Sequence, residues 1–214
     1  MNPSSDVAFT PRVKAIQAER GSRAAYARQE QKGGWPTTVT PELAQFLAEV
    51  RSFYLGTATP DGQPYIQHRG GPKGFLKVID EKTLGFADFT GNRQYLSTGN
   101  LADNPRAFLF LMDYVNRRRV KIWGTARVVD DKETIARLFP EGYEAVPEQA
   151  ILFTIAAWSR NCPQHIPQMF PAEEVMSAVD ALTARIRTLE TELAEARGLT
   201  PPGSSAAAAG PARV

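Results

Sequence analysis

Residues 106–131, RAFLFLMDYVNRRRVKIWGTARVVDD, contain two runs rich in branched and aromatic side chains, separated by a short basic turn. Such side chains favour extended structure, so the segment predicts a pair of neighbouring β-strands. The segment 52–71, SFYLGTATPDGQPYIQHRGG, repeats the arrangement around the turn signal Pro60-Asp61-Gly62. The sequence therefore predicts at least two hairpins, which are the usual units of an antiparallel sheet.

Two further segments extend this pattern. FLKVIDEKTLGFAD, residues 75–88, places an acidic turn between predicted strands at 75–79 and 84–87. ILFTIAAWS, residues 151–159, is a late and nearly continuous apolar strand. Short strands joined by tight turns predict a mainly β fold with flanking helices, in which an antiparallel sheet closes as a barrel.

Helical patterns flank the predicted barrel on its N-terminal side. Residues 12–32 are rich in helix formers, are interrupted at Gly21-Ser22 and end in the breaker KGGWP, which predicts an arm of two short helices. At 41–50, PELAQFLAEV, Thr40 can cap and Pro41 takes a first helical position. Its apolar residues share one face and predict a short amphipathic helix: Leu43, Phe46, Leu47 and Val50.

Composition limits the classes of function. The 214 residues carry a formal charge of +2, with a pI near 8.7, which is only mildly basic and gives no general nucleic-acid footprint. The N-terminus lacks the apolar core of a signal peptide, and no run approaches the roughly 18 apolar residues of a membrane span. The single cysteine, Cys162, excludes an intrachain disulfide. We expect a cytoplasmic protein with neither a nucleic-acid nor a membrane partner.

The segment FADFTGNRQY, residues 86–95, leads from a strand into a predicted helix that ends before Pro105. With Gly91-Asn92-Arg93 as the first turn of that helix, backbone N–H groups, the helix dipole and a guanidinium converge at one point. That arrangement suits an anion, most simply a phosphate. The alternative is an ordinary helix cap without a ligand.

The order of these pieces resembles the pyridoxamine 5′-phosphate oxidase-like, FMN-binding split-barrel family over about residues 42–131. The resemblance is carried by FYLGTATPDGQPYIQHRGGPKGFLKVIDEKTLGFADFTGNRQYLSTGNLADNPRAFLFL (53–111) and RRRVKIWGTARVVDD (117–131). It implies an antiparallel split β-barrel of Greek-key type, to which the chain's own helical patterns add an N-terminal helical arm and a long C-terminal helix. It also implies a homodimer with one FMN in each of two clefts at the subunit interface.

The resemblance carries over to particular positions. It places Lys77 at the strand lysine that reaches the flavin phosphate, and Asn92-Arg93-Gln94 at a Ser-Arg-Lys phosphate element, so that one charge is lost. Arg69 is the candidate substitute for the arginine of the same strand. Arg119 replaces a glutamine expected near the flavin ring.

Other residues are candidates because of their neighbourhood. His68-Arg69-Gly70-Gly71 sets a guanidinium beside backbone without side chains, which can approach a flat ring closely. The alternative for the glycines is a β-bulge at a barrel corner. Asp88 would accept a hydrogen bond from a ribityl hydroxyl or pair with Arg93.

The late segment AAWSRNCPQHIPQMF, residues 156–170, supplies the last candidates. Cys162 and His165 have a metal-like spacing, but a structural zinc needs four ligands, so no metal is predicted. We expect the strand to bring Trp158, and the loop to bring Asn161, Cys162 and His165, to the edge of the flavin. The alternative is a proline-rich loop that packs its polar groups against the barrel.

The C-terminal helix carries the seam of a left-handed coiled coil. Val179, Ile186 and Leu193 occupy a positions and Leu182 and Leu189 occupy d positions, which favours a parallel dimer. Interchain pairs of Arg185 with Glu190 and of Glu192 with Arg197 support that register, and Gly198 ends the helix. The alternative is a seam that lies against the barrel of its own chain.

The resemblance, together with these candidate residues, implies an FMN-dependent oxidoreductase that passes hydride between the flavin and a small organic donor or NAD(P)H. The Trp…Arg-Leu-His signature of the true oxidases is absent from the sequence, so we do not expect pyridoxamine phosphate oxidase activity. The alternatives are an F420-dependent reductase and a flavin- or haem-binding protein without turnover. We divide the chain into an arm (1–40), a barrel domain (41–170), a coiled-coil-like helix (171–198) and a disordered tail (199–214).

Overall fold

The computed structural model describes residues 2–160 and 163–198. The chain falls into two compact units, divided between Pro167 and Gln168. The first unit contains the arm and the sheet, and the second contains the C-terminal helix. The predicted tail, Asn161 and Cys162 lie outside the described residues.

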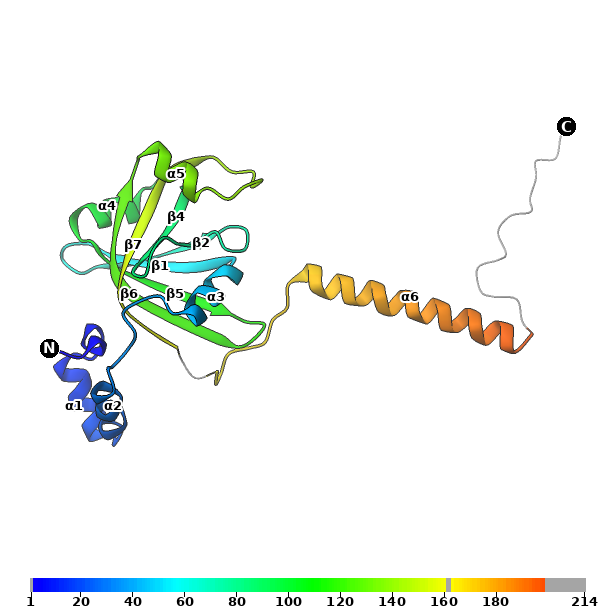
Figure 1. Ribbon diagram of the computed structural model, residues 1–214, viewed down its shortest axis with the longest axis horizontal. Coiled ribbons are helices and arrows are strands. Elements are labelled where there is room, and N and C mark those ends of the chain that lie inside the picture. Colours follow the sequence, from blue (N-terminus) through cyan, green and yellow to red (C-terminus); the bar gives the residue numbers. More distant parts are fainter. Residues whose placement is uncertain (1, 161–162, 199–214) are drawn as a thin grey trace. The chain divides into compact units, whose positions relative to one another are not determined.

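Seven strands form one antiparallel sheet in the order β2-β1-β5-β6-β7-β4-β3 (Figure 1). The strands are β1 (Ser52–Ala58), β2 (Pro64–Gly70), β3 (Lys77–Val78), β4 (Thr83–Phe89), β5 (Arg106–Asp113), β6 (Arg118–Val129) and β7 (Pro147–Arg160). Each predicted hairpin is present. The hairpins are joined into one sheet because β1 pairs with β5, and β7 pairs with both β6 and β4. The predicted mainly β split-barrel class is therefore confirmed.

The sheet surrounds one main apolar core. Side chains alternate along β5 and β6, so that Leu109 and Leu111 face inward beside Val120 and Ile122. Helix α3 (Pro41–Glu49) adds its predicted apolar face to the same core. It begins where expected, because Thr40 Oγ1 accepts a hydrogen bond from the backbone N–H of Leu43 at 3.2 Å.

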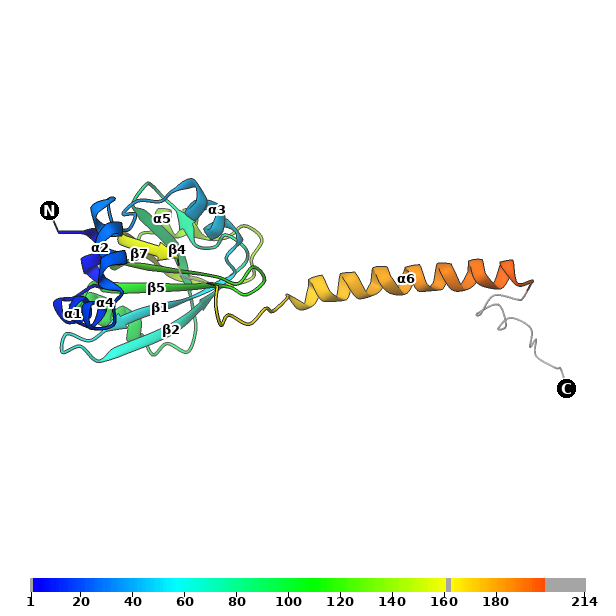
Figure 2. The ribbon, with the colours of Figure 1, turned by 90° about the horizontal axis from the view of Figure 1, so that it is seen from below.

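The remaining helices of the first unit lie around the sheet: η1 (Ser4–Val7), α1 (Pro11–Glu19), α2 (Arg23–Gln31), α4 (Leu96–Asp103) and α5 (Lys132–Leu138). Figure 2 shows β1, β2 and β5 side by side in one half of the sheet, with α3 and α5 beside the other half. Helix α5 contacts β4 and β7. Helix α4 contacts β1, β2 and β6.

Strand β6 bends at a bulge between Trp123 and Gly124, where its register against β7 shifts. A Cβ atom at Gly124 would lie 2.0 Å from the backbone oxygen of Thr154. No side chain fits there, so glycine is required by the close approach of β7.

Strand β3 is shorter than predicted. The expected strand at 75–79 is reduced to Lys77–Val78, because Gly74 takes a left-handed φ of +71° and the N–H of Phe75 bonds Pro72 O in a turn. Phe75 and Leu76 are nevertheless buried in the core. The apolar residues at the start of this segment therefore indicated burial in the core, and not a longer strand.

The turn between β5 and β6 is held by Asp113. Its carboxylate accepts hydrogen bonds from the backbone and side-chain N–H groups of Asn116, at 2.9 Å each, and from Arg118 at 2.7 and 2.9 Å. Partial burial opposes ionisation, but these donors prevail and lower the pKa of Asp113. The stability of this exposed turn therefore depends on the negative charge of Asp113.

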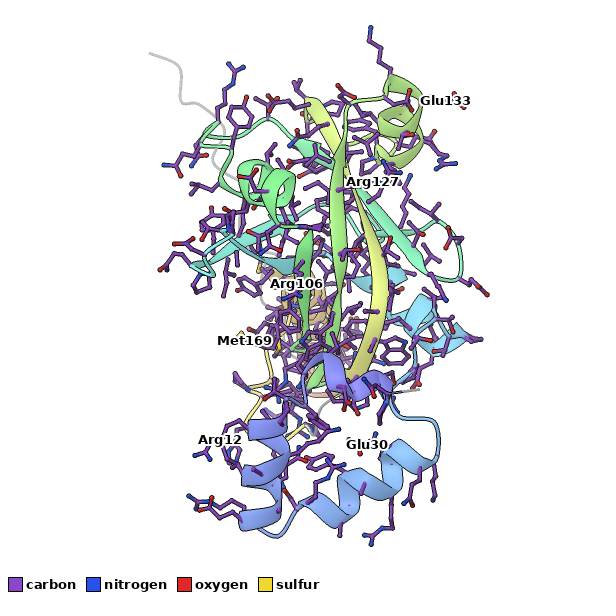
Figure 3. All side chains as sticks on the ribbon, turned by 90° about the vertical axis from the view of Figure 1, so that its left-hand side faces the viewer. Arg12, Glu30, Arg106, Arg127, Glu133 and Met169 are labelled. Atoms are coloured by element: carbon purple, nitrogen blue, oxygen red, sulfur yellow. The ribbon has the colours of Figure 1, made fainter. Side chains whose placement is uncertain are left out.

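The arm docks on the sheet through a short extended segment. The side chain of Trp35 is buried and stacks on Trp123 of β6, with ring centroids 4.8 Å apart. Trp158 of β7 donates hydrogen bonds to Pro36 O from its backbone and to Thr38 O from its indole, at 2.9 and 2.8 Å. Figure 3 shows the two arm helices at one end of the sheet, with Glu30 between them.

The second unit is dominated by α6 (Ala172–Ala196), which agrees with the predicted helix. The apolar residues of its seam are between 45% and 64% exposed: Val175, Val179, Leu182, Ile186, Leu189 and Leu193. None of the helices within residues 2–160 and 163–198 is both long and apolar enough to cross a membrane.

Candidate functional site

A cleft with a volume of about 250 Å³ lies between β2, the end of β4, the start of β7 and the loop before α4. We call it the polar cleft, and it is lined by Tyr65, Gln67, Arg69, Asp88, Phe89, residues 91–98, Glu148 and Gln149. Among the predicted cofactor-binding residues, the fold gathers Arg69, Asp88, Asn92, Arg93 and Gln94 here. Segments far apart in sequence thus meet in one concave, polar surface.

The floor of the polar cleft is an ion pair between Arg69 and Asp88, whose side chains are only 12% and 9% exposed. Gln149 Nε2 donates to the second carboxylate oxygen of Asp88 at 2.8 Å and to Thr98 Oγ1 at 2.9 Å. Burial lowers the pKa of Arg69, and the charge of Asp88 opposes that shift. The alternative pairing of Asp88 with Arg93 was wrong, because β2 brings Arg69 closer to this carboxylate.

The loop before α4 differs from its prediction. The helix begins at Leu96, not at Gly91-Asn92-Arg93, because Arg93 and Tyr95 adopt left-handed φ angles of 58° and 55°. Asn92 Oδ1 accepts a hydrogen bond from the N–H of Gln94 at 3.3 Å and so closes a local turn. The expected helix dipole therefore does not point at this position, and any anion must be bound by side chains and loop N–H groups.

The left-handed loop is stabilised by a chain of hydrogen bonds. Arg93 Nε donates to Tyr95 Oη at 3.1 Å, and Tyr95 Oη donates to Glu148 Oε1 at 2.5 Å. The bond to Tyr95 raises the pKa of Arg93. Non-glycine residues in this conformation carry backbone strain, which in proteins clusters at binding sites. These hydrogen bonds hold the exposed guanidinium of Arg93 at the mouth of the polar cleft.

Lys77 is not brought to the polar cleft. Its Nζ donates to the backbone oxygens of Arg137 and Phe139, at 2.8 and 3.4 Å, at the carboxyl end of α5. A lysine in this position satisfies free carbonyl groups and complements the helix dipole. The predicted phosphate anchor thus stabilises a helix end in this chain.

Arg119 and His68 lie on the outer face of the sheet and do not line the polar cleft. Arg119 lies over the ring of Phe110, with 5.9 Å from its guanidinium carbon to the centroid. His68 packs edge-on against Tyr54, with ring centroids 5.6 Å apart. Because alternate residues of β2 point to opposite faces, His68 lies opposite its neighbour Arg69.

The two glycines face different neighbours. A Cβ atom at Gly71 would lie 2.6 Å from the ring of Phe75. Glycine at this position therefore leaves room for a core side chain of the same protein. At Gly70 the nearest atom would be Cε1 of His68 at 3.2 Å. Neither backbone lines the polar cleft.

The predicted residues of the late segment are dispersed. Trp158 is buried and bonds to the arm, away from the polar cleft. His165 is exposed in a turn with a φ of 60°, and Asn161 and Cys162 lie outside the described residues. Within residues 2–160 and 163–198, no group of three His, Cys, Asp or Glu side chains could hold a metal ion.

Two of the three arginines proposed for the flavin have a side-chain donor without a partner among the described residues. Among the described residues, the Nε atoms of Arg69 and Arg119 are buried without a hydrogen-bond partner. A buried donor without an acceptor costs about 1–3 kcal/mol, so each position favours a ligand that supplies an acceptor.

Several residues of the polar cleft were missing from the sequence prediction. Gln67 accepts a hydrogen bond from Ser97 Oγ at 2.6 Å, and its place two residues before Arg69 could have predicted a shared strand face. Glu148 and Gln149 come from the start of β7, and no local signal links them to β4. Tyr95 gave no signal either, since its role depends on a left-handed backbone.

The family model described as pyridoxamine 5′-phosphate oxidase matches residues 39–169, which is more than half of the chain. The chain belongs to this family. The matched range contains every strand of the sheet, both arginines with unsatisfied donors and the whole lining of the polar cleft. The helices of the N-terminal arm and α6 lie outside it.

Solved structures of several proteins are similar to this family member. HupZ from Group A Streptococcus is 19% identical, with 62% of this chain and 99% of that chain covered and a TM-score of 0.47. A protein described as an F420 reductase is 22% identical, with 56% and 98% covered and a TM-score of 0.40. The FAD binding protein from Mycobacterium smegmatis is 19% identical, with 59% and 97% covered and a TM-score of 0.40. At this level of similarity none of them assigns a function, and no curated protein matches the chain.

Proposed function

We propose that this chain is an FMN-dependent oxidoreductase that works as a homodimer, with hydride passing between the flavin and a small organic donor or NAD(P)H. The observation that carries the proposal is the pair of buried, unsatisfied Nε atoms on Arg69 and Arg119. In a family whose members bind flavins, the phosphate, ribityl and ring oxygens of FMN are acceptors of the required kind.

The residues of the polar cleft fit the polar half of FMN. Arg93, Asn92 and Gln94 stand at its mouth and would bind the phosphate, while Arg69 and Gln67 would bind the ribityl chain. Asp88 and Glu148 offset the positive charges of Arg69 and Arg93. The affinity for FMN would therefore depend more on well-oriented hydrogen-bond donors than on the net charge of the cleft. When bound, the flavin ring supplies the hydride chemistry, and the protein supplies orientation and electrostatic tuning.

The position of Arg119 supports the homodimer. Arg119 is on the outer face of β6 and does not line the polar cleft of its own chain. A flavin held by Arg69 would therefore meet Arg119 from a second copy. The outer face also carries exposed apolar side chains, including Ile66 at 67% and Tyr54 at 39% exposure, which suit a subunit interface.

A second element of the proposed homodimer is α6. Its exposed seam is unusual for a helix in water, and a parallel partner would bury it by knobs-into-holes packing. The four interchain ion pairs expected in a parallel dimer, Arg185 with Glu190 and Glu192 with Arg197 in both directions, favour this orientation.

The first experiment is an absorbance spectrum of the purified protein, with mass spectrometry of whatever heat releases. Bands of oxidised flavin with the mass of FMN are expected. Bleaching by NADH or NADPH and recovery in air would support turnover. A released mass of F420 or haem, or a bound flavin that no donor reduces, would overturn the FMN-dependent oxidoreductase.

The shared site is tested by complementation. Arg93→Ala and Arg119→Met are expected to weaken flavin binding separately, while Arg127→Met, an exposed arginine of the same strand labelled in Figure 3, should not. Because a mixed dimer would have one intact site, co-expression of the two variants should restore flavin to about a quarter of all sites. Purified heterodimers without flavin would contradict a site made by two subunits.

A further inference from the structure

We propose that the cleft between the N-terminal arm and the sheet binds a small planar aromatic molecule that carries a negative charge. This arm cleft has a volume of about 680 Å³, within the size range of small-molecule sites. It shares no lining residue with the polar cleft. The inference goes beyond the proposed function and does not depend on which cofactor the barrel binds.

Aromatic rings form much of the wall of the arm cleft. Phe9 of the arm packs edge-on against Tyr26 and Trp35, with centroids 5.1 and 4.9 Å apart, and Trp35 stacks on Trp123 of β6. The rings come from both sides, since three belong to the arm and two, those of Trp123 and Trp158, belong to the sheet. Offset or edge-on contacts with such rings favour a flat aromatic ligand over an aliphatic one of equal size.

A cation that has no carboxylate partner among the described residues, Lys121, faces this wall. Lys121 Nζ lies 5.3 Å from the ring centroid of Trp123, and no carboxylate of the described residues lies within ion-pair distance. Arg160, which also lines the cleft, is already paired with Glu42. The charge left to attract a ligand is therefore that of Lys121.

The surroundings of Lys121 favour an anion for a second reason. Burial and, after it, the positive charge of Arg119 lower the pKa of Lys121. A bound carboxylate would offset both effects, because it stabilises the ammonium form and screens it from Arg119. The position of Lys121 beside several aromatic rings thus favours a ligand that is both negatively charged and flat.

The test uses three probes on the full chain, each titrated by isothermal calorimetry. 2-Naphthoate has the ring and the negative charge, 2-naphthylmethylamine has the ring with a positive charge, and cyclohexanecarboxylate has the charge without the ring. We expect naphthoate to bind at least about tenfold more tightly than either of the others. Equal binding of the three probes, or no binding of naphthoate at millimolar concentration, would overturn the proposal.

Variants locate the binding. Lys121→Met should weaken naphthoate binding about tenfold and strengthen binding of the amine, whose repulsion by Lys121 it removes. The variant should fold because it also removes a repulsion with Arg119. Phe9→Leu should weaken both aromatic probes. The matched control is Lys82→Met, in an exposed turn, which should change nothing. If Lys121→Met and Lys82→Met behave alike, or if only Arg93→Ala reduces naphthoate binding, the ligand lies elsewhere.

Discussion

Replacing Asp88 with asparagine should destabilise the fold by about 3 kcal/mol, because it leaves the guanidinium of Arg69 buried without a countercharge. Both side chains are about nine-tenths buried, and arginine does not lose its proton in response. The expected cost is at the low end for a broken buried pair, since an asparagine oxygen can still accept one hydrogen bond. It is nonetheless a large share of the 5–15 kcal/mol that stabilises a typical domain.

Equilibrium unfolding in urea measures this loss. With a slope of about 2 kcal/mol per molar urea, the midpoint should fall by about 1.5 M without a change of slope. The matched control is Asp113→Asn, which breaks an ion pair with the half-exposed Arg118 and should cost under about 1 kcal/mol. Adding Arg69→Met to Asp88→Asn should recover part of the stability. Equal losses from Asp88→Asn and Asp113→Asn would refute the buried pair as a structural element.

Four other outcomes are expected. Arg93→Ala should weaken FMN binding about tenfold by calorimetry, and unchanged affinity would rule out its contact with phosphate. The lowered pKa of Asp113 contributes stability that is present above the unfolded pKa of about 3.9 and is lost as pH falls through the folded value, so thermal melts of Asp113→Asn should show a smaller acid loss than wild type. Arg185→Glu should weaken self-association in analytical ultracentrifugation, and adding Glu190→Arg should restore it; no effect would favour a seam that packs elsewhere. Gly124→Ala should abolish soluble expression, because its Cβ would overlap Thr154 O.

The sequence predicted well those elements whose causes are local. The hairpins around Pro60-Asp61-Gly62 and Asp113, and the helix capped by Thr40, each depend on residues a few positions apart. Turn chemistry and side-chain alternation act at that range, so the pattern is visible without a structure. The same locality explains the two arm helices, separated at Gly21 with its φ of 78°.

The candidate site was predicted in part because its chemistry is not local. Arg69 and Asp88 were both candidates, but their pairing is set by the curvature of a sheet in which four other strands lie between β2 and β4. Gln149 reaches Asp88 across 61 residues, which no short motif records. The prediction for Lys77 was wrong because the sequence indicates its strand but not the end of α5, whose carbonyl groups accept hydrogen bonds from the Lys77 ammonium group.

The loop between β4 and α4 explains why the predicted helix start failed while the predicted residues still share a cleft. The Asn92 side chain accepts a hydrogen bond within its own turn, and Arg93 and Tyr95 have left-handed backbone angles, so no helix begins here. In place of a helix dipole, the loop presents the guanidinium of Arg93, which donates to Tyr95, which in turn donates to Glu148. A helix start offers fixed backbone donors, whereas this loop offers a side chain on a strained backbone. Phosphate affinity at such a site would depend strongly on the Tyr95–Glu148 contact, which no helix cap would require. Tyr95→Phe, which removes only the hydroxyl that links Arg93 to Glu148, should therefore reduce FMN affinity without loss of the fold.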